Sequence, residues 1–212
     1  MMRFSRAIPL AAVLLSASSL ASAASSTDLA VKGLITPSAC TLDLPGGVVD
    51  HGKISAKDLN QDSHTQLEAK TLQLSVSCEA KTLFAIVPID NRAGSGSISG
   101  DGVYGLGLVN GTQKLGFYEL MLRNPVTDLP SAILLELRYE DRWMDLWPED
   151  PTTPNRMVAF GNFSMDVGYF PEPVKNAAVE IVINSRITPA RNLTLTNEVA
   201  LDGSATLELK YL

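Results

Sequence analysis

The sequence contains only two histidines, His51 and His64, and only two cysteines, Cys40 and Cys78. Neither histidine stands at metal-ligand spacing from another ligand, so a zinc site is not expected. A catalytic triad needs an imidazole held against a nucleophile, and the neighbouring Asp50 does not place His51 on a serine. We therefore expect no enzyme activity, no metal and no cofactor. A secreted hydrolase is the weakest of the functional hypotheses.

Basic residues are also few. The chain has 17 lysines and arginines against 23 aspartates and glutamates, which gives a formal net charge of −6. Such a chain repels the phosphate backbone, and no basic cluster offsets this, so a nucleic-acid partner is not expected. No apolar run reaches the length of about 20 residues that a membrane-spanning helix requires.

The first 23 residues have the pattern of an export signal. Arg3 and Arg6 precede an apolar stretch from Ala7 to Leu15, and small residues follow up to Ala23. This order is typical of a secretory signal peptide cleaved after Ala23, whereas the apolar stretch is too short for the alternative, a membrane anchor. Loss of the two arginines would leave 15 basic and 23 acidic residues, a net charge of −8. We expect export through the inner membrane and no transmembrane segment after cleavage.

Export determines how the two cysteines are interpreted. An even number of cysteines in an oxidising compartment favours a disulfide, here between Cys40 and Cys78. Closing a loop of this length contributes about 3–4 kcal/mol in the chain-entropy estimate. The alternative is a pair of independent buried thiols.

Strand patterns dominate the rest of the chain. Apolar and polar residues alternate in "TLQLSVSC" (71–78) and again in the final segment from Val199, and both patterns indicate half-buried strands. Gly- and Pro-rich turns separate the candidates, so we predict an all-β, immunoglobulin-like sandwich. Only residues 55–70 lack strand alternation, and we expect a loop there with at most one short helical turn. The further candidate strands are residues 82–90, 114–122, 132–139, 156–170 and 177–185.

The segment "YEDRWMDLWPEDP" holds the only tryptophans, Trp143 and Trp147, among several acidic residues. Exposed aromatic faces beside carboxylates can hold sugars, which makes a glycan contact one interpretation. The other, which we favour, is that one or both indoles fill the sandwich core while the acids face solvent.

Several motifs carry a family resemblance. "VKGLITPSAC", "DHGKI" and the cysteine that ends "LSVSC" resemble the start of a chaperone–usher pilin, although His51 stands where pilins have an aromatic residue. Tyr211 matches the penultimate tyrosine of pilins. More narrowly, "IDNRAGS", "YGLG" and "DGSATLELKYL" resemble the fimbrial-like proteins catalogued as domain of unknown function 1120. The resemblance covers nearly the whole chain after residue 23.

The resemblance implies an incomplete sandwich whose missing strand is supplied by a partner. In pilins a periplasmic chaperone lends a strand to the groove beside the last strand, and the N-terminal extension of the next subunit later replaces it at the outer-membrane usher. The protein is thus expected to be a structural subunit of a surface fimbria. Its expected organisation is a signal peptide (1–23), an N-terminal extension with the start of the first strand (24–39), and the sandwich (40–212).

The resemblance also assigns residues. It implies that the extension donates a strand through Leu29, Val31 and Gly33, and that basic chaperone residues anchor the carboxylate of Leu212. The wall of the groove would be formed by Leu201, Gly203, Ala205, Leu207, Leu209, Tyr211 and Leu212. Two alternatives remain open at this point: the last strand closes a complete sandwich, or the protein is a secreted glycan-binding adhesin or lectin-like module.

Overall fold

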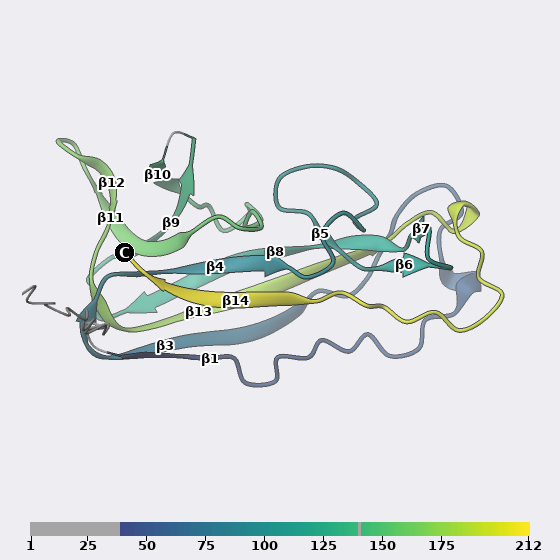
Figure 1. Ribbon diagram of the computed structural model, residues 1–212, viewed down its shortest axis with the longest axis horizontal. Helices are drawn as coiled ribbons and strands as arrows, with labels where there is room; N and C mark the ends of the chain where they lie inside the picture. The colour runs from purple at the N-terminus through teal and green to yellow at the C-terminus, as the bar shows by residue number, and fades with distance from the viewer. Residues whose placement is uncertain (1–38, 140) are drawn as a thin grey trace, which may run out of the picture. The chain divides into compact units, whose positions relative to one another are not determined.

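The computed structural model describes residues 39–139 and 141–212, and within them the regular secondary structure is almost entirely β-strand (Figure 1). Two six-stranded antiparallel sheets and one small two-stranded sheet are formed. The helices there are two single 3-10 turns, η1 (Ala56–Asp58) and η2 (Ala190–Asn192), and none is long and apolar enough to cross a membrane. The predicted all-β sandwich and the short turn within residues 55–70 are confirmed.

The first large sheet has the strand order β1-β3-β13-β8-β5, with β2 paired to β13. Its strands are β1 (Cys40–Asp43), β2 (Thr65–Gln66), β3 (Lys70–Thr82), β5 (Tyr104–Gly105), β8 (Gly116–Thr127) and β13 (Val174–Ile187). The long β13 is central because its alternating apolar residues bury one face along its whole length. Val179, Ile181 and Ile183 are almost fully buried, while the residues between them are half-buried on the other face.

The second large sheet has the order β10-β9-β11-β4-β14, with β12 paired to β11. Its strands are β4 (Phe84–Asp90), β9 (Ile133–Arg138), β10 (Arg142–Asp145), β11 (Val158–Ser164), β12 (Gly168–Pro171) and β14 (Ala205–Tyr211). The small third sheet pairs β6 (Leu108–Val109) with β7 (Gln113–Lys114).

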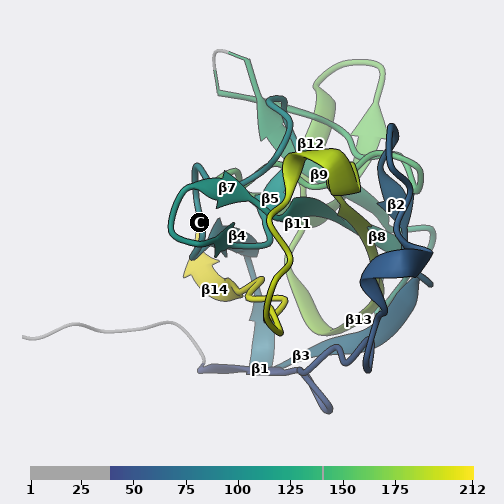
Figure 2. The same ribbon diagram turned by 90° about the vertical axis from the view of Figure 1, so that its right-hand side faces the viewer.

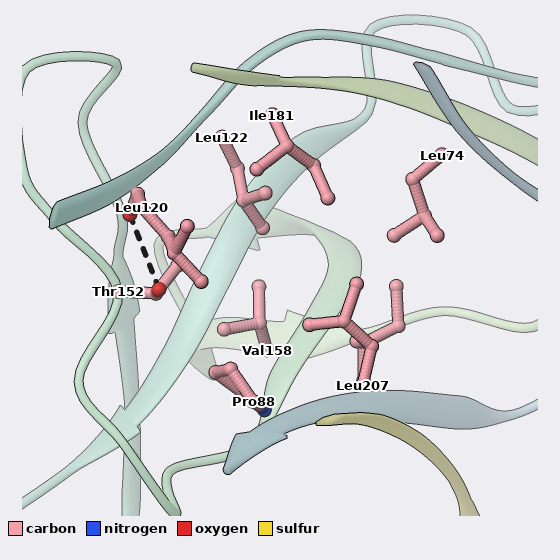
Figure 3. A pocket seen from close by; sticks show the side chains of 9 residues that line it. Leu74, Pro88, Leu120, Leu122, Thr152, Val158, Ile181 and Leu207 are labelled. Atoms are coloured by element: carbon pink, nitrogen blue, oxygen red, sulfur yellow. Dashed lines mark hydrogen bonds between the residues drawn. The ribbon is translucent and has the colours of Figure 1, made fainter. Parts of the chain in front are cut away.

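The core lies between the two large sheets and is tightly packed. Figure 3 shows Leu74, Leu120 and Ile181 pointing from the first sheet toward Pro88, Val158 and Leu207 of the second. The enclosed space that these side chains leave is only about 10 Å³, about the lower limit for a single water molecule. The middle of the sandwich is therefore closed, and the larger opening described below is a feature of its edge.

Two predicted strands differ from the structure. Residues 156–170 form a hairpin, β11 and β12, whose turn exposes Met165 and Val167, and Gly168 has a φ of 84°. The last strand begins at Ala205 rather than at Val199, because the ladder with β4 starts there. Apolar and polar residues continue to alternate through both segments, but alternation does not show at which residue pairing with the neighbouring strand begins or ends.

A buried carboxylate joins the second sheet to the loop that crosses it. Glu136 is fully buried, and its Oε2 lies 2.7 Å from Nε of Arg138 and 3.7 Å from Nη1 of Arg156. The main-chain N–H of Thr153 donates to Oε1 at 2.7 Å. Both carboxylate oxygens therefore have partners, and these hold the loop against β9.

We expect Glu136→Ala to lower the free energy of unfolding by about 2–3 kcal/mol. Removal of a buried charge partner is strongly destabilising, but both arginines reach solvent and can be partly hydrated. The measurement is urea unfolding of the purified variant. The control is Asp101→Ala, which removes an exposed partner of Arg156 (3.3 Å) and should change stability by less than about 0.5 kcal/mol. Equal effects of the two substitutions would contradict this role of Glu136.

Candidate functional site: an open cleft between two sheet edges

Two strands at the edges of different sheets lie near each other without pairing. Among the described residues β1 pairs only with β3, and β14 pairs only with β4. Figure 2 shows the two strands at the same side of the sandwich, each at the end of its own sheet. One side-chain contact joins them, because the N–H of Cys40 donates to the hydroxyl of Tyr211 at 3.0 Å. Since Cys40 begins β1 and Tyr211 ends β14, the two strands run in opposite directions.

Within residues 39–139 and 141–212, no strand pairs with the outer edge of β14. Asn91 donates to the carbonyl of Ser204 at 2.9 Å, Leu212 donates to the carbonyl of Leu83 at 3.1 Å, and the register between them is unbroken. Even-numbered residues therefore direct their N–H and C=O groups toward β4. In an antiparallel ladder the odd-numbered residues direct theirs the opposite way. The main-chain groups of Leu207 and Leu209 thus point out of the sheet, toward the space beside β1.

The edge strand β1 has the complementary arrangement. Glu79 donates to the carbonyl of Ala39 at 3.1 Å, so the odd-numbered residues of β1 face β3. By the same alternation, the main-chain groups of Leu42 point away from β3. Leu42 and Leu209 are also half-buried against the core. Each edge therefore presents inward-facing apolar side chains together with main-chain groups directed into the intervening space.

A cleft of about 360 Å³ opens between the residues that follow β1 and those that begin β14. One wall is formed by the segment from Leu44 to His51, and the other by the segment from Leu201 to Leu207. The floor consists of core side chains of the first sheet and the adjoining loop: Leu72, Leu106, Tyr118, Leu120, Ile181, Ile183 and Ser185. Here the interior of the sandwich is open at its edge, unlike the closed space shown in Figure 3.

The floor contains a few polar groups. Nε2 of His51 lies 3.2 Å from the buried hydroxyl of Ser185, and burial, with a further contribution from Lys70, lowers the pKa of His51. Tyr118 is 94% buried, and among the described residues its hydroxyl has no hydrogen-bond partner. Burial raises the pKa of Tyr118, so the phenol is protonated at neutral pH. The cleft therefore offers hydroxyls and a neutral imidazole on a mainly apolar surface.

Gly203 lies directly against Tyr118. A Cβ at this position would stand 3.0 Å from Cε1 of the Tyr118 ring and 2.9 Å from Cδ2 of Leu106. The absence of a side chain lets the main chain of this wall pack on the floor. Glycine at this position therefore allows a close approach between the main chain of the wall and a core tyrosine.

We expect Gly203→Ala to lower the free energy of unfolding by about 1 kcal/mol, because the added methyl group overpacks this contact. The control is Gly47→Ala on the opposite wall, where the nearest atom to a Cβ is the carbonyl oxygen of Leu44, at an ordinary 3.4 Å. Thermal unfolding of both variants provides the comparison. If Gly203→Ala is as stable as Gly47→Ala, the wall shifts to accommodate the added methyl group without lowering the free energy of unfolding.

The three narrow motifs of the sequence meet at the end of the cleft beside Gly203. Asp90 of "IDNRAGS" accepts from the N–H of Gly105 in "YGLG" at 3.0 Å, and Arg92 binds Asp202 of "DGSATLELKYL". Asn91 also donates to the hydroxyls of Ser204 and Thr206, both at 3.0 Å. These contacts, which we call the motif clamp, fix the beginning of the last strand.

The predicted groove residues are only partly gathered at the cleft. Leu201, Gly203, Ala205 and Leu207 line it, whereas Leu209 and Tyr211 lie further along the same edge. Leu212 is 45% exposed at the end of the strand. Sequence reasoning missed the opposite wall, from Leu44 to His51, and the clamp residue Arg92. Arg92 and His51 stood in quoted motifs, whereas residues 44–49 stood in none, and nothing in the sequence showed what these residues contact.

The other predicted residues are the two cysteines, the N-terminal segment and, treated in the next paragraph, the tryptophans. The Cys40–Cys78 disulfide is confirmed, and it joins β1 to β3 at a directly paired position. The signal peptide (1–23) and the donor residues Leu29, Val31 and Gly33 lie outside the described residues, and their assignment remains a prediction.

The tryptophans do not fill the core. Trp147 is 60% exposed, and Trp143 is only half-buried on β10, at the sheet edge opposite β14. The interpretation as core residues is therefore wrong for Trp147. The turn from Trp147 to Asp150 contains one proline and two acidic residues, and Arg123 donates to the carbonyl of Pro148 at 2.9 Å.

Comparison with known proteins agrees with the narrower resemblance. Residues 29–116 match the model of a protein family described as "Protein of unknown function (DUF1120)". Over nearly its whole length the chain is similar to protein GltF of Escherichia coli K12, with 25% identity and 92% of each chain covered. It is also similar to the uncharacterized protein YhcF of the same organism, with 23% identity over 91% of this chain and 93% of YhcF.

Proposed function

We propose that the protein is a structural subunit of a bacterial surface fimbria, completed by a β-strand from a partner. The observation that supports this most strongly is the cleft between the unpaired edges of β1 and β14, with core residues in its floor. Exposed edges and apolar slots favour aggregation, so an exported protein that keeps one open needs an occupant. Strand addition satisfies the main-chain groups through hydrogen bonds and fills the slot with alternate side chains.

The geometry of the two edges restricts how a strand can be added. Because β1 and β14 run in opposite directions, a strand laid between them is parallel to one and antiparallel to the other. It meets the outward main-chain groups of Leu207 and Leu209 on one side and those of Leu42 on the other. Its inward side chains replace the missing part of the core.

The partners follow from this mode of completion. In the periplasm a pilus chaperone supplies the strand, and at the outer-membrane usher a neighbouring subunit replaces it. The donated segment of this chain is the N-terminal extension with Leu29, Val31 and Gly33. The final location is the cell surface, in the fimbrium. Neither catalysis nor a cofactor is involved.

Hydrogen exchange at single residues tests the open edge. In the protein purified without a partner, the amides of Leu207 and Leu209 should exchange rapidly, whereas those of Glu208 and Lys210, which face β4, should be protected. Addition of a complementing strand, such as a synthetic peptide of residues 27–38, should protect the odd-numbered amides only. Protection of all four amides in the free protein would contradict the proposal, because the edge would already be paired.

A second function, glycan binding, is favoured by one observation. Trp147 is 60% exposed beside Glu149 and Asp150, as in an aromatic platform for a sugar ring. On this alternative the protein is a secreted adhesin, and Trp143 contributes from the neighbouring strand. Glycan-array binding that is lost in Trp147→Ala, with the fold intact, would support it. If no glycan on the array binds, this alternative is dropped and only the fimbrial proposal remains.

A further inference from the structure

The cleft wall from Leu201 to Ser204 lies outside any strand. The ladder with β4 begins at Ala205, and only the carbonyl of Ser204 extends it by one bond, from Asn91. Before that residue the wall has irregular main chain at the surface. Its position therefore depends on individual contacts and not on a sheet.

The strongest of these contacts is made by Arg92. Its Nε donates to Oδ2 of Asp202 at 2.8 Å and its Nη2 donates to Oδ1 at 2.7 Å, a two-point pairing. Planar guanidinium and carboxylate groups in this arrangement fix orientation as well as distance. The N–H of Asp202 also donates to the carbonyl of Leu106 at 3.2 Å. Asp202 is thus held at both its side chain and its main chain.

Arg92 is itself held in place before it binds Asp202. Its main-chain N–H donates to Oδ1 of Asp90 at 2.9 Å, and the other carboxylate oxygen of Asp90 accepts from Gly105. Asp90 is 9% exposed, so this anchor is nearly buried. The guanidinium therefore projects from an anchored turn, and its planar shape limits the side-chain entropy lost for each hydrogen bond that it forms.

We propose that Arg92 is a positioning residue for strand capture: through Asp202 it holds Leu201 and Gly203 as the end of the cleft wall. This inference rests on the proposed function. Asp202 stands between these two residues, and both line the cleft. Without the pair, the segment before β14 is free to take many positions over the cleft, and an incoming strand must order it at the moment of binding.

Because the Arg92–Asp202 pair is exposed, its loss should change the affinity for a donated strand more than the free energy of unfolding. The side chain of Arg92 is 38% exposed and that of Asp202 is 59% exposed. Exposed ion pairs contribute little to global stability, because water and salt screen them. The core beneath the wall is held by other contacts. Loss of the pair should therefore leave unfolding unchanged while it weakens capture.

The test measures strand affinity and stability on the same variants. The probe is a fluorescent peptide of residues 27–38 of this chain, titrated into the mature protein. Asp202→Asn should weaken peptide binding about three- to tenfold, as expected for loss of a charged two-point contact. The melting temperature without peptide should stay at the wild-type value. The reversed pair Arg92→Asp with Asp202→Arg should recover part of the affinity.

A control is available in Asp62, which pairs with Arg191 at 2.6 Å on a more exposed part of the surface. Neither residue lines the cleft, so Asp62→Asn should bind the peptide as the wild type does. Wild-type affinity in Asp202→Asn would overturn the positioning role and leave the proposed function standing. A fall in melting temperature that matches the loss of affinity would also overturn it, because the pair would then be structural. A wild-type protein that captures neither the peptide nor a pilus chaperone overturns the proposed function and this inference together.

Discussion

Deletion of Lys210–Leu212 is expected to abolish capture of the protein by a pilus chaperone. Tyr211 links the two open edges, because its hydroxyl accepts a hydrogen bond from the N–H of Cys40. Leu212 donates the last bond of the ladder, to Leu83. Without these residues the end of β14 loses its partner strand, and the edge that receives a donated strand becomes shorter.

Co-purification with a tagged chaperone from the periplasm measures this effect. Two full-length controls separate the contributions at this end. Lys210→Ala removes an exposed side chain and should be captured normally, and Tyr211→Phe removes only the bond to Cys40 and should be captured less well. If the truncated chain co-purifies as efficiently as the full chain, the last strand is not the receiving edge.

Replacement of either cysteine by serine is expected to lower periplasmic yield sharply. The disulfide closes a loop with a sequence separation of 38, which contributes about 3–4 kcal/mol in the chain-entropy estimate. β1 is only four residues long and has one neighbouring strand, so few other contacts hold this wall of the cleft. Loss of the covalent link should free β1 and expose the core to proteolysis and aggregation.

Soluble yield from the periplasm, compared by immunoblot, is the measurement. Cys40→Ser, Cys78→Ser and the double variant should all fall to a similar low level, because each removes the same bond. Ser77→Ala, which loses only an exposed hydrogen bond to Asn176 (3.0 Å), is the neighbouring control. Wild-type yield in both single variants would show that the disulfide is dispensable for folding.

The sequence allowed the strands and the disulfide to be predicted because both depend on local signals. Alternation in residues 71–78 marks a strand with one buried face, and an export signal makes a lone cysteine pair a disulfide. The start of the last strand was misplaced for a related reason. Val199, Leu201 and Gly203 continue the alternation, yet they line a cleft or pack at its edge without a ladder partner.

The motif clamp could not be derived from the sequence. Arg92 and Asp202 are separated by 110 residues, and each has other charged residues nearer in the chain. Their pairing follows from the return of the last strand alongside β4, which places Ser204 opposite Asn91. Trp147 illustrates the same limit, because an indole among acids has the same pattern in the sequence whether it is buried or exposed.

The central claim is that this sandwich is completed by another protein, and co-expression tests it most directly. The full precursor would be produced in a bacterial periplasm with and without a cognate pilus chaperone, and soluble protein would be analysed by size-exclusion chromatography with light scattering. The account predicts a soluble one-to-one complex with the chaperone and a much lower yield of soluble protein without it, because most of the chain is then degraded or aggregates. An equal yield of monomer with and without the chaperone, and no complex between them, would contradict the account, because the sandwich would then be complete by itself.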